Sequence, residues 1–255
     1  MTEDVLLSAR GLTKRFGGLA AVNDVSIDLW RGCIHAVIGP NGAGKSTLTN
    51  LLSGDMAPTA GSVMLGGQDV TGWNPEKISG QGLGRSYQKT NIFLPFTVWE
   101  NVRLASQSRQ PEAMKWLRRA TDFVAINDRA ASAIEQSGLK DWHRSIAGAM
   151  SHGEQRQLEI AMTLATNPQV LLLDEPLAGM GALEAERMIG LLRSLKTNHA
   201  ILLVEHDMDA VFTLADRLTV MVNGQVIASG APAAVRADAG VQAAYLGEDL
   251  VEHGR

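Results

Sequence analysis

The chain carries at residues 39–47 the stretch G-P-N-G-A-G-K-S-T, whose residue types and spacing suit the binding of phosphate groups. It fits the pattern G-x-x-x-x-G-K-[S/T], in which glycines let the backbone turn tightly and point successive N–H groups at phosphate oxygens. We expect the Lys45 ammonium to face the β- and γ-phosphates and the Ser46 hydroxyl to bind Mg²⁺. The stretch predicts a nucleoside triphosphate site made by Gly39, Pro40, Asn41, Gly42, Ala43, Gly44, Lys45, Ser46 and Thr47.

The segments on both sides of this loop support that prediction. Residues 33–38 are largely apolar and β-branched, as expected of a buried parallel strand. Leucines with helical spacing follow at 48–52, and Gly54 lies where a helix would end. We expect a helix from Thr47 onward, whose positive N-terminal end adds to the anion site.

Two adjacent carboxylates, Asp174 and Glu175, follow the apolar run 170–173. A buried strand that ends in Asp delivers a carboxylate to the carboxyl edge of a parallel sheet, where the phosphate-binding loop also lies. We expect Asp174 to bind Mg²⁺ and Glu175 to orient or deprotonate the attacking water. The alternative is a pair of surface acids after a strand, but the loop in the same chain favours the catalytic interpretation.

A histidine, His206, follows another strand-like run at 201–205 and should reach the same edge of the sheet. It could contact the γ-phosphate of the nucleotide. The alternative is that this stretch only begins a helix, because Asp207 is a good N-cap residue.

The stretch 150–155 (M-S-H-G-E-Q) precedes a helix predicted over 153–166. Ser151 and Glu154 have the spacing of a capping box, which is a purely structural device. A helix N-terminus with a hydroxyl and a nearby glycine can also bind phosphate. The residues alone leave both interpretations open and do not indicate whose phosphate would be bound.

The beginning of the chain has the pattern of an antiparallel β unit. Strand-like residues 6–12 and 21–29 flank a turn at Gly17 and Gly18. Phe16 lies beside that turn, well before the phosphate-binding loop. An aromatic side chain there could stack on adenine, although an aromatic residue at a strand end is usually part of the core.

Further strand-like and helical stretches alternate along the rest of the chain, which predicts an α/β fold with a parallel sheet covered on both faces. From 97 to 137 the strand patterns vanish, and Met114, Leu117, Thr121 and Val124 follow the helical period, which indicates an inserted helical segment. The predicted strands are 61–65, 84–88, 170–174, 200–205 and the hairpin 218–222 with 225–228; the predicted helices include 158–165 and 188–195.

Composition narrows the class of protein. The net charge is −4 and no block of Lys or Arg stands out, so a surface for nucleic acid is not indicated. The longest apolar runs are strand-sized and the first residues are no signal peptide, which points to a cytosolic protein. Cys33 is the only cysteine, so no internal disulfide can form, and we expect it to be a small buried hydrophobe.

Over nearly its whole length the sequence resembles the ATP-binding cassette (ABC) ATPases. Residues 39–47 look like the Walker A motif, 151–155 like the signature and 170–174 like Walker B. The resemblance makes Glu175 the catalytic glutamate, His206 the switch histidine, Gln88 the Q-loop glutamine and Phe16 the aromatic residue that stacks on adenine.

This resemblance implies a P-loop NTPase fold: a RecA-like parallel-sheet core (about 1–88 and 151–255), an N-terminal antiparallel β unit, and an inserted helical subdomain (about 89–150), all in one domain. It implies ATP and Mg²⁺ as cofactors, with Gln88 beside the metal ligands Ser46 and Asp174. Two cassettes, identical or paralogous, pack head to tail in this family. The signature of one then contacts ATP held by the Lys45 equivalent of the other, through Ser151, His152, Gly153 and Glu154.

Two motifs depart from the usual family pattern. The signature is M-S-H-G-E at 150–154 instead of L-S-G-G-Q, and the stretch 177–181 (L-A-G-M-G) lacks the Asp that is common there. These variants, with E-H-D-M at 205–208 and A-Y-L-G-E at 244–248, resemble the ATPases of bacterial branched-chain amino-acid importers. We hypothesise that the unusual His152 gains a proton when the two cassettes close on ATP, because a facing γ-phosphate favours imidazolium whereas the positive helix end alone disfavours it. The alternative is a solvated histidine that only tolerates the position where the family usually has glycine.

We therefore expect an ATPase subunit on the cytoplasmic face of the inner membrane. Its partners would be a second cassette, a membrane permease that the helical subdomain contacts and, indirectly, a periplasmic substrate-binding protein, with no nucleic acid. The importers of urea and amides are similar, and a soluble ABC ATPase is a further alternative. A GTPase would carry an Asn-Lys-x-Asp motif, which is absent, and a P-loop kinase would not explain 151–155 or His206.

Overall fold

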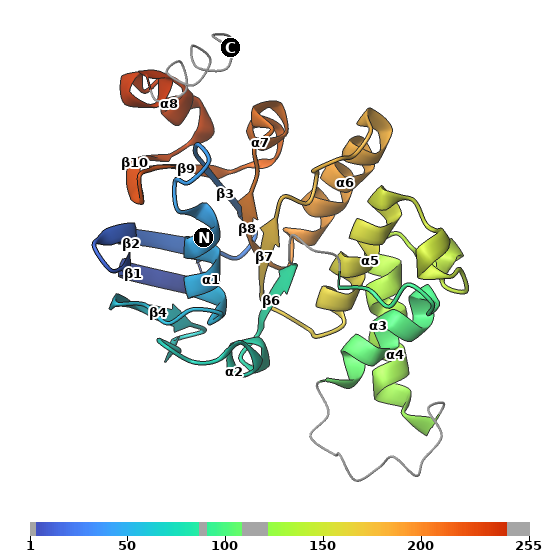
Figure 1. The fold of residues 1–255 in the computed structure, drawn as a ribbon. Helices are drawn as coiled ribbons and strands as arrows, with labels where there is room; N and C mark the ends of the chain where they lie inside the picture. Colours follow the sequence, from blue (N-terminus) through green and yellow to red (C-terminus); the bar gives the residue numbers. More distant parts are fainter. Residues whose placement is uncertain (1–3, 87–90, 109–121, 244–255) are drawn as a thin grey trace. The chain divides into compact units, whose positions relative to one another are not determined.

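The computed structural model describes residues 4–86, 91–108 and 122–243, and the chain forms two compact units (Figure 1). The first unit comprises residues up to 83, 169–175 and those from 196 onward, and the second comprises 84–168 and 176–195. Several predictions fall outside the described residues: Gln88, the helical positions 114, 117 and 121, and the stretch 244–248.

The first unit contains the predicted antiparallel β unit. The strands β1 (Val5–Phe16), β2 (Leu19–Trp30), β4 (Ala60–Leu65) and β5 (Gln68–Asp69) form a sheet in the order β2-β1-β4-β5. β1 and β2 are a long hairpin closed at Gly17, where φ is 58°. The prediction of an antiparallel unit ahead of the phosphate-binding loop is confirmed.

The second sheet of this unit is parallel at its centre, with strands in the order β10-β9-β3-β8-β7. All five residues are buried in each of β3 (Ile34–Ile38), β7 (Val170–Asp174) and β8 (Ala200–Val204). The hairpin β9 (Arg217–Val222) with β10 (Gln225–Gly230) turns at Asn223 and Gly224, as predicted. The predicted strand 84–88 is found as β6 (Leu83–Ser86).

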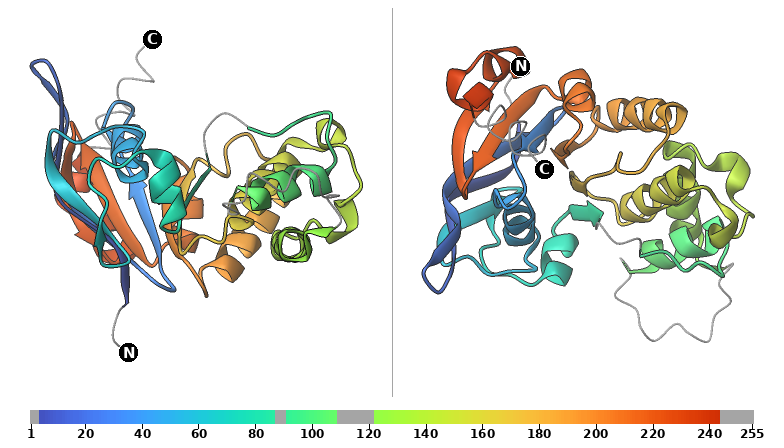
Figure 2. Two further views of the ribbon diagram at one scale, coloured as in Figure 1. Left: turned by 90° about the horizontal axis from the view of Figure 1, so that it is seen from below. Right: turned by 45° about the horizontal axis from the view of Figure 1, so that its top comes forward.

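The core of this unit lies between the two sheets and the helix α1 (Lys45–Ser53). β2 packs against β8 and β10 and so joins the sheets (Figure 2). Other helices in the described part of this unit include α2 (Pro75–Gly80), α7 (Met208–Leu214) and α8 (Pro232–Arg236). One expectation is wrong: Cys33 is partly exposed, because β3 begins only at Ile34 and the cysteine belongs to the preceding turn.

A buried histidine ties four strands together. Nδ1 of His35 lies 3.1 Å from the Asp28 carbonyl oxygen, which can only accept, so Nδ1 carries the proton. Nε2 therefore accepts from the Thr219 hydroxyl at 2.8 Å, and Thr219 in turn accepts from Ser229 at 2.8 Å. Burial lowers the pKa of His35 to about 4. The ring is neutral in the folded protein and links β2, β3, β9 and β10.

This histidine predicts a loss of stability in mild acid. Unfolded His35 takes up a proton near pH 6.5, whereas folded His35 does so only near pH 4. The stabilising contribution is complete above about pH 6.5, falls as the pH drops towards 4, and levels off below that value. The fall should be on the order of 3 kcal/mol in the free energy of unfolding, measured by denaturant titrations across this range.

Replacing the histidine isolates its contribution. His35→Gln should remove this part of the pH dependence, at a cost in stability near pH 7 because the hydrogen-bonded chain is broken. His143→Gln is the matched control, because His143 is exposed and should leave the slope unchanged. An unaltered slope in His35→Gln would show that His35 is not held neutral.

The second unit is helical. Its described residues form α3 (Val98–Gln107), α4 (Val124–Gln136), α5 (His152–Leu164) and α6 (Ala182–Leu195), with short 3-10 turns at Lys140–Trp142 and Ala147–Ala149. α3, α4 and α5 pack against one another, and α5 also contacts α6. α3 and α4 confirm helical structure within 97–137. No helix in the described ranges has the length and apolar character needed to cross a membrane.

Candidate active site

The register of three parallel strands brings the predicted motifs to one edge of the sheet. Val204 of β8 pairs with Val37 of β3 on one side and with Asp174 of β7 on the other. The phosphate-binding loop follows β3, His206 follows β8 and Glu175 follows β7. The prediction that these motifs share the carboxyl edge of the sheet is confirmed.

The loop after β3 has the backbone that its glycines were expected to provide. Gly42 and Gly44 have φ values of 80° and 101°, which other residues rarely adopt. A Cβ at Gly39 would lie 2.1 Å from the carbonyl oxygen of Met221, so the loop passes too close to β9 for a side chain. The helix α1 begins at Lys45 rather than at Thr47, because the left-handed Gly44 turns the chain one residue before it.

Lys45 is buried inside this loop, with 6% of its surface exposed. Its Nζ donates hydrogen bonds to the carbonyl oxygens of Gly39 at 2.5 Å and Pro40 at 3.0 Å. The ammonium is therefore held at the centre of the loop, next to the N-terminus of α1. This places positive charge and helix N–H groups at one point, which is the chemistry of an anion site.

Glu175 and His206 form a contact pair beyond the ends of β7 and β8. Oε1 of Glu175 lies 2.5 Å from Nε2 of His206. The Glu175 backbone is left-handed (φ 50°) and its N–H donates to the Val204 carbonyl oxygen at 2.8 Å, so the sheet fixes this unusual turn. Asp174 is buried at the end of β7. The structural interpretation of Asp207 is also confirmed, since it caps α7 by accepting from the Ala210 N–H.

The N-terminus of α5 in the second unit carries the predicted capping box. The Glu154 N–H donates to Ser151 Oγ at 3.3 Å, and the Ser151 N–H donates to Glu154 Oε2 at 2.8 Å. The Ser151 hydroxyl also donates to Oε1 of Glu184 at 2.8 Å, which lowers the pKa of that carboxyl. A Cβ at Gly153 would lie 2.8 Å from the same oxygen, so a larger residue here would require the end of the Glu184 side chain to shift.

Sequence reasoning missed Glu184, as well as a second carboxylate in this unit. Glu184 lies three residues after Gly181 and accepts a hydrogen bond from the Gly181 N–H. This spacing of a carboxylate at a helix start was the sequence signal that could have identified Glu184. Glu159 pairs with Arg156 at 2.8 Å inside α5 and accepts from the backbone N–H of Asn91 at 3.0 Å. This buried pair anchors the chain just after residues 87–90.

Phe16 lies at the end of β1 with 49% of its surface exposed. The Lys14 ammonium lies 5.5 Å from the centroid of its ring. Since half of the ring faces solvent, the alternative that Phe16 is a core residue is wrong.

Comparisons with known proteins agree with this geometry. The family model described as "ABC transporter" matches residues 22–178, and one described as "Branched-chain amino acid ATP-binding cassette transporter" matches residues 225–251. The branched-chain amino acid transport ATP-binding protein LivG of Escherichia coli (strain K12) is 39% identical over 250 residues, covering 95% of this chain and 98% of LivG. BraF of Pseudomonas aeruginosa is 35% identical, with the same coverage of 95% and 98%.

A solved structure gives the same result for the fold. The ADP conformation of MJ1267, an ATP-binding cassette of an ABC transporter, superposes with a TM-score of 0.84 at 30% identity, covering 95% of this chain and 99% of that one. The family model spans more than half of the chain, and the loop at 39–47, Glu175 and His206 follow neighbouring strands at one edge of the sheet. This chain belongs to the ABC transporter family, as an ATP-binding subunit that hydrolyses ATP.

Proposed function

We propose that this chain drives a bacterial importer of branched-chain or other hydrophobic amino acids. The observation that carries the proposal is the identity of 39% to LivG over almost the whole of both chains, together with the branched-chain family model over 225–251. Closure of two cassettes on ATP would move a membrane permease, and hydrolysis would reopen them. The chain would work on the cytoplasmic face of the inner membrane, with a periplasmic binding protein delivering the amino acid to the permease.

The phosphate-binding loop holds the triphosphate in this proposal. Residues 39–47 wrap the phosphates, Lys45 faces the β- and γ-phosphates, and Phe16, half of whose surface is exposed, stacks on adenine. Ser46 and Asp174 supply the oxygen ligands that suit Mg²⁺, and Gln88 supplies a third. When bound, Mg²⁺ neutralises charge on the phosphate oxygens. The buried position of Asp174 and the place of Ser46 in the first turn of α1 support this assignment.

Glu175 and His206 carry the hydrolytic step. Glu175 orients the attacking water and takes up its proton. His206 contacts the γ-phosphate and, through the contact of 2.5 Å, holds the Glu175 carboxylate in place. The rigid left-handed turn at Glu175 supports this role, because a general base has to be held within hydrogen-bond reach of the water.

The N-terminus of α5 completes the ATP site of a partner cassette. Ser151, His152, Gly153 and Glu154 lie at the start of this helix, whose positive N-terminal end favours an anion. The carboxylate of Glu184 already accepts a hydrogen bond from the Ser151 hydroxyl there. An incoming γ-phosphate therefore has to replace this carboxylate as the acceptor. This observation supports an anion-binding role for the turn.

His152→Gly tests the proposed protonation at this turn. We expect the pH profile of ATP turnover to change shape between mildly acid and mildly alkaline conditions, because the coupled proton is lost with the imidazole. His143→Gly, at an exposed position away from the helix start, should leave the profile unchanged. Profiles that differ only by a constant factor would assign His152 no coupled proton.

Lys45→Ala should weaken nucleotide binding with little effect on the fold. The change removes the charge next to the β- and γ-phosphates, and a charge-assisted hydrogen bond contributes about 1.5–3 kcal/mol, or roughly a 10- to 100-fold change in affinity. Calorimetric titration with ATP measures it, with Lys77→Ala as the control for a general loss of surface charge. Wild-type affinity in folded Lys45→Ala would refute this role.

Transport by the assembled importer tests the substrate class. The chain would be reconstituted in proteoliposomes with the permease encoded beside its gene, the partner cassette and the binding protein. We expect ATP-dependent uptake of radiolabelled leucine, isoleucine or valine that competes poorly with urea and short amides. Uptake of urea or an amide alone would assign the chain to that related class of importers, and the absence of permease genes beside it would favour a non-transport ATPase.

A further inference from the structure

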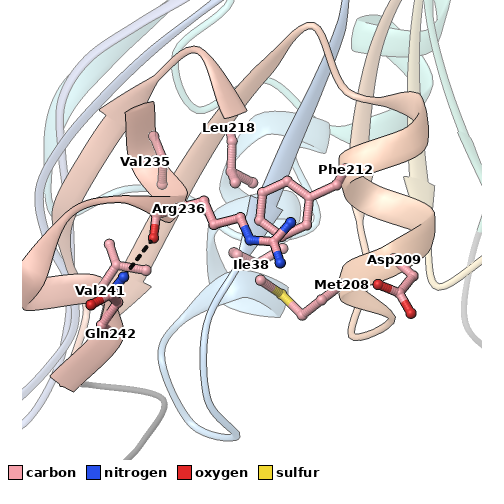
Figure 3. A pocket seen from close by; sticks show the side chains of 9 residues that line it. All are labelled: Ile38, Met208, Asp209, Phe212, Leu218, Val235, Arg236, Val241 and Gln242. Carbon is pink, nitrogen blue, oxygen red and sulfur yellow. Dashed lines mark hydrogen bonds between the residues drawn. The ribbon is translucent and has the colours of Figure 1, made fainter. Parts of the chain in front are cut away.

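A pocket of about 250 Å³ lies within the first unit, lined by residues of α7, α8, β3 and β9 (Figure 3). Its walls are mostly apolar, and the Arg236 guanidinium lies against the Phe212 ring, 5.0 Å from the ring centroid. Sites for drug-sized ligands usually measure about 300–1,000 Å³. This smaller space, whose cation already contacts an aromatic ring, points to no class of ligand.

A carboxylate of the second unit carries more information. Oε1 of Glu184 accepts from the Ser151 hydroxyl at 2.8 Å, at the N-terminus of α5, and Oε2 accepts from the Gly181 N–H at 3.4 Å, just before α6. The bond from Ser151 lowers the pKa of the Glu184 carboxyl, and the N–H groups of Gly181 and Gly153 and the nearby His152 add to this effect. Glu184 is therefore an anion at neutral pH, seated at the start of α5.

The hydrogen bond between Ser151 and Glu184 is not needed to cap either helix. Ser151 caps α5 as an acceptor, since its Oγ receives the Glu154 N–H at 3.3 Å. Glu184 reaches back to the Gly181 N–H through its other oxygen, Oε2. The hydroxyl hydrogen of Ser151 serves neither cap, so its position against Glu184 calls for a different explanation.

The two anions that Ser151 has to serve exclude each other. A hydroxyl has a single hydrogen to donate. In the proposed function Ser151 donates it to the γ-phosphate of ATP held by the partner, whereas in the structure it goes to Oε1 of Glu184. The carboxylate and the phosphate also repel each other at such short range. Glu184 has to give up the hydroxyl when the γ-phosphate arrives.

We propose that Glu184 is a positioning residue that holds the Ser151 hydroxyl in the single cassette and opposes closure until the γ-phosphate of ATP displaces it. ADP lacks the displacing group and leaves the contact in place, so the contact favours closure on ATP over closure on ADP. This inference rests on the proposed function of the α5 turn.

Release of the hydroxyl requires only a side-chain rotation. Glu184 lies in the first turn of α6 and is partly exposed, so its carboxylate can turn towards solvent. Water then replaces Ser151 as the donor, and the backbone of both helices keeps its own hydrogen bonds. A contact that breaks this easily can be exchanged in every cycle of closure and reopening.

Pairing of cassettes with Mg-ATP tests the proposal in the Glu175→Gln background, where closed pairs accumulate. Glu184→Gln removes the charge but keeps an amide oxygen that can accept the Gly181 N–H. Releasing one such exposed bond should favour closure roughly threefold, so two identical cassettes with two bonds should gain about tenfold in association constant. Light scattering over a range of protein concentrations measures this gain. With a paralogous partner only one bond is released, and the gain should be about threefold.

Glu186→Gln is the matched control, because it removes the same charge from an exposed position on the same helix. We expect no gain from it. Ser151→Ala shows whether Glu184 acts through the hydroxyl: in that background Glu184→Gln should give no gain. A gain that persists without the hydroxyl would overturn the proposal, because the charge alone would then explain it.

The remaining outcomes separate this inference from the proposed function. Equal association constants for Glu184→Gln and Glu186→Gln would overturn the inference, and a weaker association of Glu184→Gln would do the same by showing that the carboxylate assists closure. If Ser151→Ala pairs more weakly than its parent in these cases, the shared ATP site stands and only the role of Glu184 is refuted. If Ser151→Ala pairs as tightly as its parent, Ser151 does not contact ATP and both are refuted.

Discussion

Glu175→Gln is expected to lower ATP turnover by about 10²–10⁴-fold, the range typical for removal of a general base. The amide keeps the shape of the side chain and can still form a hydrogen bond with His206, which lies 2.5 Å away, but it cannot take up a proton. The backbone turn at position 175 depends on a main-chain hydrogen bond to Val204 and should persist. Phosphate release at saturating Mg-ATP measures the effect, and calorimetry should show that ATP still binds.

A matched control and a second readout make this result specific. Glu186→Gln removes an exposed carboxylate on α6 and should leave turnover unchanged. With Mg-ATP, Glu175→Gln should accumulate the closed pair of cassettes, visible by light scattering, or a heterodimer if a paralogous cassette is added. Turnover close to wild type would remove Glu175 from its proposed role. A variant that stays monomeric with ATP and with candidate partners would contradict the shared site.

The parts of the site that could be predicted are those that short stretches of sequence determine. The spacing of glycines, lysine and serine at 39–47 predicts the phosphate-binding loop, and four apolar residues before Asp174 predict the strand β7. The common sheet edge follows from a general rule, because parallel strands present their carboxyl ends together. The capping box of α5 and the turn at Asn223 also depend only on neighbouring residues.

The contacts that escaped prediction join residues far apart in sequence. Ser151 meets Glu184 across 33 positions, and His35 meets Thr219 across 184. Such pairs depend on how helices and strands pack, which residue spacing does not encode. Cys33 is a local failure of a different kind: the apolar run suggested a strand residue, but the strand begins one residue later.

The two glycines of the phosphate-binding loop predict very different effects of the same substitution. At Gly44 (φ 101°) a Cβ would lie 2.3 Å from the carbonyl oxygen of Ala21, which is main chain in β2 and cannot move aside. At Gly42 (φ 80°) nothing lies within 4 Å of a Cβ. At both positions an alanine has to adopt the left-handed backbone conformation, which lowers the free energy of unfolding by about 1–2 kcal/mol. Only Gly44→Ala adds a steric clash.

Gly44→Ala should therefore lower the free energy of unfolding by about 2–5 kcal/mol, the sum of backbone strain and an overpacked contact, and Gly42→Ala by only about 1–2 kcal/mol. Chemical denaturation at neutral pH without nucleotide measures both. Gly44→Ala should also abolish measurable ATP binding, since α1 begins at the next residue and its N-terminus would be displaced from the phosphates. Equal destabilisation by the two alanines would mean that β2 yields to the new methyl group, and that the close approach of the loop to this strand does not fix its conformation.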